Sequence, residues 1–138
     1  MAGLDTRLED NDSAIKNLKA SLKAEPKGVE SLTGLSSLIT QQSGLADAVA
    51  FVGEHCDSYP EQAHCRHILG SLHAQSGNAD KAITELEAAL SLNDKLLMTY
   101  RQLAKVHGFQ RNKEGVISVL ERGLAATKDQ GLAFDMAN

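Results

Sequence analysis

The residues most capable of chemistry lie between positions 55 and 67. His64 and His67 are three residues apart, so on a helix they would share a face, as metal ligands often do. His55 and Cys56 precede them, and Cys65 lies between them. A zinc site needs about four ligands in fixed geometry, and no CxxC or HExxH pattern is present. We therefore predict no metal site, and we expect both histidines to face a groove while Cys65 packs between helices.

The two cysteines, Cys56 and Cys65, are too few for a disulfide scaffold. A bridge between them would require the helix ends that carry them to lie close together. The helical pattern described below explains the fold without a bridge. The sequence therefore favours buried or half-buried free thiols.

Catalytic patterns are also missing from the sequence. Nucleophilic catalysis needs a Ser or Cys, a base and an oxyanion donor in one pocket, whereas packing explains most Ser and His positions here. No GxxxxGK[ST] phosphate loop occurs, and carboxylates such as Glu85 and Glu87 are typical of a solvated helix face. We predict that the chain is not an enzyme and uses no cofactor.

Composition restricts the remaining classes of function. The 138 residues carry a formal net charge of -4, and without a clustered basic footprint nucleic acid is a poor partner. No run approaches the roughly 18 apolar residues of a membrane-spanning helix, so membrane insertion is not expected. The segment 1–5 has no export signal, which favours the cytoplasm, although removal of a signal would leave the periplasm open.

A repeat of 34 residues organises the chain. Apolar columns four residues apart recur with this period and form one stripe of a helix. The columns are Ala14, Ala48, Ala82 and Val116; then Leu18, Val52, Leu86 and Leu120; then Leu22, Cys56, Leu90 and Leu124. Pro26 and Pro60 end two of these helices, and Asp94 and Lys128 replace proline in the later copies.

A second set of columns marks another helix in each unit. Leu35, Leu69 and Leu103 align, and each is followed by a small residue that allows close helix packing: Ser36, Gly70 and Ala104. Turn residues separate the two helices at 43–44, 76–78 and 111–112. Each unit is therefore expected to be a helix, a tight turn and a second helix.

These columns resemble the tetratricopeptide repeat, most clearly over residues 63–96 with Ile68-Leu69-Gly70, Gly77-Asn78 and Lys81-Ala82. The resemblance implies an all-α fold of antiparallel helix-turn-helix repeats stacked in a right-handed superhelix. We expect a single domain over 1–138, with a partial repeat at 1–28, mainly its second helix at 12–24, and repeats at 29–62, 63–96 and 97–130. Residues 131–138 are expected to be a truncated or capping helix.

In similar proteins the first helix of each pair lines a concave groove that holds peptides or helices of partners. Groove positions are those outside the packing columns: Thr33, Ser37, Gln41, His64, His67, Ser71, Gln75, Met98, Arg101, Lys105 and Phe109. The groove changes from neutral to basic along the chain, which suits an acidic or carboxylate-bearing peptide. The competing interpretation is that Arg101 and Lys105 are ordinary solvated charges. If both histidines face the groove, acidification would strengthen binding of an acidic partner.

The predicted function is a protein–protein interaction module or scaffold. The alternative is a self-assembly or spacer segment of a larger multi-repeat protein, for example in secretion, pilus or polysaccharide-export machinery. Exposed Leu132, Phe134 and Met136 favour weak self-association through the terminal helices.

Overall fold

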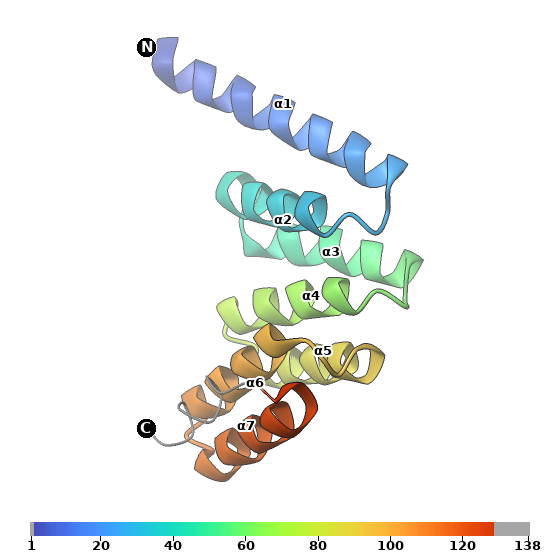
Figure 1. The fold of residues 1–138 in the computed structure, drawn as a ribbon. Coiled ribbons are helices and arrows are strands. Elements are labelled where there is room, and N and C mark those ends of the chain that lie inside the picture. The colour runs from blue at the N-terminus through green and yellow to red at the C-terminus, as the bar shows by residue number, and fades with distance from the viewer. Residues whose placement is uncertain (1, 129–138) are drawn as a thin grey trace. The chain divides into compact units, whose positions relative to one another are not determined.

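The structure is a computed structural model that describes residues 2–128, with side chains described from residue 11 onward. This part of the chain consists of seven α-helices and contains no strand (Figure 1). The helices are α1 (Ala2–Ala24), α2 (Val29–Ser43), α3 (Leu45–Ser58), α4 (Ala63–Gln75), α5 (Ala79–Leu92), α6 (Leu97–Phe109) and α7 (Lys113–Thr127). The prediction of an all-α fold built from helix pairs is confirmed.

Contacts divide the chain into two compact units, Met1–Pro60 and Glu61–Asn138. Unit 1 contains α1 to α3, and unit 2 contains α4 to α7. The boundary lies two residues before the repeat boundary expected after Gln62. The single domain over 1–138 and its internal division stay a prediction.

In unit 1, α1 is one unbroken helix of 23 residues. The sequence indicated a helix over 12–24 as the second helix of a partial repeat, with the first helix of that repeat either missing or reduced to about residues 1–9. Residues 9–12 contain no Pro or Gly that would end a helix, so the same helix continues through them. Leu22 of α1, Leu35 of α2 and Val52 of α3 are buried in the core of this unit.

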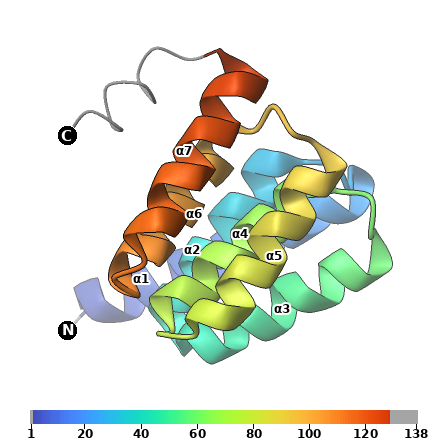
Figure 2. The ribbon, with the colours of Figure 1, turned by 90° about the horizontal axis from the view of Figure 1, so that it is seen from below.

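Unit 2 is built around a cluster of buried side chains from α5, α6 and α7, among them Leu86, Leu103 and Leu120, and the partly buried Ala74 of α4 packs against it. Figure 2 shows α5 beside α4 and α7 beside α6, as the contacts between these helices require. At Gly70 of α4, a Cβ would lie 2.7 Å from Cγ of Leu86 and 3.2 Å from the Ala82 carbonyl oxygen. The small residue expected in this column is therefore needed for α4 and α5 to pack.

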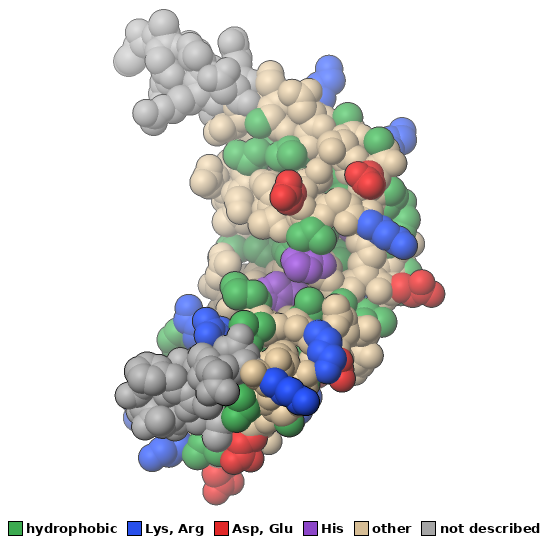
Figure 3. All heavy atoms as spheres, viewed as in Figure 1, with side chains coloured by type: hydrophobic (Ala, Val, Ile, Leu, Met, Phe, Trp, Pro, Cys, Tyr) green, Lys and Arg blue, Asp and Glu red, His purple; other side chains and the backbone are tan. Residues whose placement is uncertain are grey.

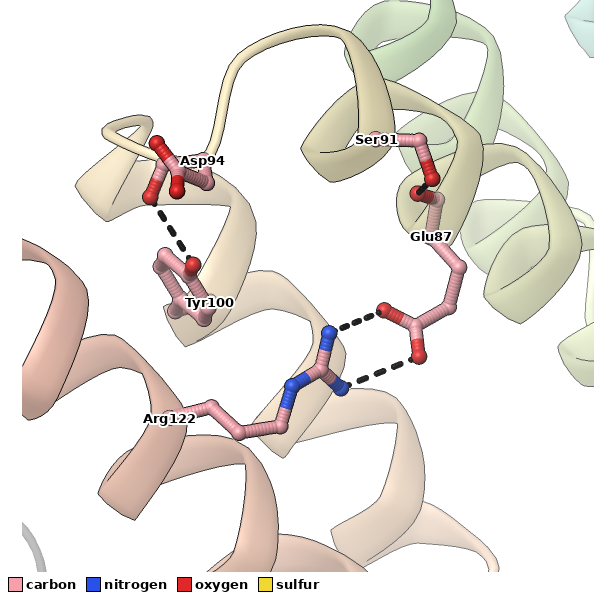
Figure 4. A network of polar contacts seen from close by, with 5 residues as sticks. All are labelled: Glu87, Ser91, Asp94, Tyr100 and Arg122. Atoms are coloured by element: carbon pink, nitrogen blue, oxygen red, sulfur yellow. Dashed lines mark hydrogen bonds and ion pairs between the residues drawn. The ribbon is translucent and has the colours of Figure 1, made fainter.

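Polar contacts join α5, α6 and α7 (Figure 4). Arg122 of α7 donates two hydrogen bonds of 3.0 Å to the carboxylate of Glu87 in α5. The Tyr100 hydroxyl of α6 donates to the Asp94 carbonyl oxygen at 2.8 Å. Bidentate geometry fixes the direction of the Arg122–Glu87 pair, although its exposure keeps its energy small.

The turns that lack proline are held by other means. Asn93 Oδ1 accepts a hydrogen bond from the Lys95 backbone N–H at 3.0 Å, and Tyr100 anchors Asp94 as described above. Lys128 ends α7 in the left-handed conformation, with φ at 58°, and its N–H donates to the Leu124 carbonyl oxygen. Specific contacts thus replace the rigidity of Pro26 and Pro60 at these two positions.

The prediction of free thiols is wrong. Neither cysteine is free, since Cys56 and Cys65 are both disulfide-bonded, and both side chains are completely buried. Each cysteine lies within one turn of a helix end, because α3 ends at Ser58 and α4 begins at Ala63. Disulfide geometry depends on how such helix ends are placed in space, which residue spacing alone does not determine.

Candidate functional site

Helices α4 and α6, the first helices of the two pairs in unit 2, contact each other directly. His67 Nδ1 of α4 lies 2.9 Å from the Thr99 hydroxyl of α6, and Thr99 is completely buried. This hydrogen bond sets the two helices side by side. We give the name α4–α6 face to the predicted groove residues of these two helices: His64, His67, Ser71, Gln75, Met98, Arg101, Lys105 and Phe109.

The α4 part of this face contains both histidines. His64, His67 and Ser71 are half-buried, whereas Gln75 is exposed. The rings of His64 and His67 are 6.1 Å apart between centroids. Burial, and then the nearby His64, lower the pKa of His67 below its ordinary value of 6.5. Histidine side chains reach the surface over α4 in Figure 3.

The α6 part of the face is both basic and apolar. Met98 and Phe109 are 68% and 76% exposed, and Arg101 and Lys105 between them are also exposed. The spacing of these four residues by three and four places them along one stripe of the helix, about 16 Å long. The stripe therefore offers apolar contact at both ends and positive charge in the middle.

An open pocket of about 350 Å³ adjoins Phe109 at the end of α6. We call it the Phe109 pocket, and its lining is mostly apolar: Ala74, Gly77, Ala79, Val106, Phe109 and Gln110. Gly77 lies in the turn after α4 with φ at 80°, where a side chain would be strained. The sequence pattern predicted Phe109 as a groove residue and Gly77 only as part of a turn, and it did not predict Ala79, Val106 or Gln110.

In unit 1, the predicted site residues Thr33, Ser37 and Gln41 lie on α2, and all three are exposed. The Thr33 hydroxyl donates to the Val29 carbonyl oxygen at 2.8 Å, so its hydrogen is already engaged within the helix. This set is neutral, as the sequence predicted.

The remaining predictions concern the C-terminal segment, metal binding and membrane insertion. Leu132, Phe134, Met136 and the segment 131–138 lie outside the described residues. Within residues 11–128, whose side chains the structure describes, no group of three or more His, Cys, Asp or Glu is arranged to hold a metal ion. No helix in this part of the chain is long and apolar enough to cross a membrane. Cys65, beside His64, cannot act as a thiolate ligand while it is disulfide-bonded.

Residues 63–96, which contain α4, α5 and the turn between them, match the family model of the tetratricopeptide repeat. The chain therefore contains a tetratricopeptide repeat over these residues. This repeat region is the one that carries the histidines and one wall of the Phe109 pocket. No curated protein matches the sequence significantly.

Solved structures with the same fold cover nearly the whole chain. A MamA protein is 26% identical to this chain, with a TM-score of 0.67. The matched region covers 91% of this chain and 69% of the MamA chain. The thermophilic tetratricopeptide-repeat protein TTC0263 of Thermus thermophilus is 21% identical, with a TM-score of 0.74. The matched region covers 96% of this chain and 74% of the TTC0263 chain. A chain in the structure of Naa15/Naa10 bound to HypK-THB is 22% identical, with a TM-score of 0.70. The matched region covers 99% of this chain and 21% of that longer chain.

These likenesses confirm the predicted helical repeat fold of the chain. The fold indicates a protein–protein interaction module, since such repeats generally bind other proteins rather than catalyse reactions.

Proposed function

We propose that this chain binds a segment of a partner protein along the α4–α6 face. The observation that carries the proposal is the stripe on α6, where the two most exposed large apolar side chains of the described residues, Met98 and Phe109, flank two cations. Exposed apolar groups that gather with a pocket are typical of interaction surfaces. When bound, the partner segment buries the side chains of Met98 and Phe109.

The chemistry of the stripe defines the segment that fits it. Arg101 and Lys105 favour a carboxylate, and arginine can bind one through two parallel hydrogen bonds. Met98 adapts its shape to an apolar side chain, and the Phe109 pocket accepts another. The segment is therefore acidic in its middle and apolar toward its ends. In unit 1, Thr33, Ser37 and Gln41 of α2 offer neutral hydrogen-bonding groups of their own.

A pH dependence belongs to this proposal. Protonation of His67 adds positive charge to the face and strengthens binding of an acidic segment. Because the pKa of His67 is lowered, its contribution begins at a lower pH than that of an ordinary histidine. If the affinity for the segment stays constant from about pH 8 to pH 5.5, the histidines do not take part in binding it.

Affinity capture from a lysate of the source cell tests the basic stripe. The Arg101→Glu/Lys105→Glu variant reverses both charges, so a specific partner should be reduced by roughly five-fold or more. The matched control is Lys81→Glu/Lys113→Glu, which makes the same charge change at exposed positions of α5 and α7. Loss of the partner in the control as well, or retention in both variants, contradicts the assignment.

A further inference from the structure

Unit 1 contains a pocket of its own between α1 and α3, with a volume of about 250 Å³. We call it the α1–α3 pocket. It combines two cations, three rings and one aliphatic side chain: Lys19, Leu22, Lys23, Phe51, His55 and Tyr59. By the repeat columns, α1 and α3 are second helices of their pairs, so this pocket is separate from any surface formed by the first helices.

The aromatic wall of the pocket is held in place by contacts within unit 1. Phe51 and His55 are four residues apart on one face of α3, and Tyr59 follows directly after the end of this helix as its C-cap. The rings of His55 and Tyr59 are 4.9 Å apart between centroids. His55 Nε2 lies 3.1 Å from the Pro26 carbonyl oxygen, which can only accept, so Nε2 is the protonated nitrogen of this contact. The turn after α1 thus orients the wall on α3.

The opposite wall is positively charged in a chain whose net charge is negative. Between Asp12 and Glu25, α1 carries Lys16, Lys19 and Lys23 and no acidic residue. Lys19 Nζ lies 5.5 Å from the centroid of the Phe51 ring, within the range of a cation–π contact. Among the described residues no carboxylate lines the pocket, and Asp47, one helical turn before Phe51, is outside the lining.

We propose that the α1–α3 pocket binds an acidic peptide segment of a partner protein, with carboxylates at Lys19 and Lys23 and an apolar side chain against Phe51 and Tyr59. Charge complementarity selects the acidic groups, because the described lining has two ammonium groups and no anion to neutralise them. The half-buried Phe51 and the exposed Tyr59 supply area for an apolar or aromatic side chain. The site does not depend on the α4–α6 face, and either can fail without the other.

The test is an NMR titration of the ¹⁵N-labelled chain with the N-acetylated tripeptide amide Glu-Phe-Glu. Amide shifts should change at Phe51, His55 and Tyr59 and at the end of α1, since the ring of the probe lies against these residues. The probe Gln-Phe-Gln should cause no comparable change, and inorganic phosphate at equal ionic strength should not reproduce the pattern. Shifts that are equal for both peptides, that phosphate reproduces, or that occur elsewhere would overturn the proposal.

Two variants separate the pocket from general charge. Lys19→Glu/Lys23→Glu should weaken binding of Glu-Phe-Glu by about ten-fold or more, because two attractions become repulsions. Lys16→Glu/Lys27→Glu makes the same charge change at exposed positions outside the lining and should stay within about two-fold of the original affinity. All four lysines are exposed, so neither variant disturbs the core. An equal loss in the two variants would reduce the effect to net charge and contradict the site.

Discussion

The hydroxyl of Thr99 is completely buried, and its contact holds the ring of His67 partly below the surface of the α4–α6 face. Residue spacing placed both histidines on one side of a helix, and the structure brings their rings together. Spacing could not show the contact with Thr99, because that contact joins helices 32 residues apart in the chain. The environment that shifts the pKa of His67 therefore became visible only in three dimensions.

We predict that the free energy of unfolding decreases as the pH falls below about 6.5, the ordinary pKa of histidine in an unfolded chain. The folded state binds the proton of His67 less readily than the unfolded state, so its contribution is full above this pH and is lost toward the lowered folded pKa. Urea unfolding at pH 7.5 and pH 5.5 measures the change.

The variant His67→Gln keeps a group that can hydrogen-bond to Thr99 but does not titrate, so its stability should depend less on pH. Some dependence should remain, because burial and Lys81 also lower the pKa of the half-buried His73. An unchanged pH dependence in His67→Gln would show that His67 is not responsible.

At the scale of the helices, the 34-residue columns predicted all seven helices, α1 only over residues 12–24, and the turns between paired helices. They could not predict where α1 begins, since only its second half follows the repeat. They also missed a contact that recurs two repeats apart: Gln42 Nε2 donates to Asp12 Oδ1 at 2.6 Å, and Gln110 Nε2 donates to Asp80 Oδ1 at 3.4 Å. Amide–carboxylate pairs leave no apolar signal in a sequence.

Two glycines allow the packing of α4 on α5 to be tested against a control. Gly70→Ala should lower the free energy of unfolding by about 1–2 kcal/mol, because the new Cβ meets Leu86 and the Ala82 backbone. Gly108→Ala in α6 should raise it by up to about 1 kcal/mol, since the nearest atom lies 4.0 Å away and alanine favours the helix. Chemical denaturation of both variants measures the difference, and a similar stabilisation by both would mean that α4 and α5 do not need the glycine.

At the scale of the whole molecule, the sequence predicted the repeat fold and a class of function, and the solved structures confirm that fold. The predicted groove residues divide between two units, with Thr33, Ser37 and Gln41 in one and the remainder in the other. Apolar periodicity reports on contacts between neighbouring helices, so it identifies surfaces by elimination and carries no information on what covers them. The Phe109 pocket escaped prediction for this reason, because its small residues also suit a turn.

Site-specific photo-crosslinking tests the central claim, that a partner segment lies along the α4–α6 face. A benzoylphenylalanine placed at Met98 reports on this face, and one placed at Ile117 of α7, which is 41% exposed, reports on a second helix. We predict that the partner captured from the source lysate is crosslinked from position 98 and not from position 117. Crosslinking of that partner from position 117 alone would contradict the proposed face.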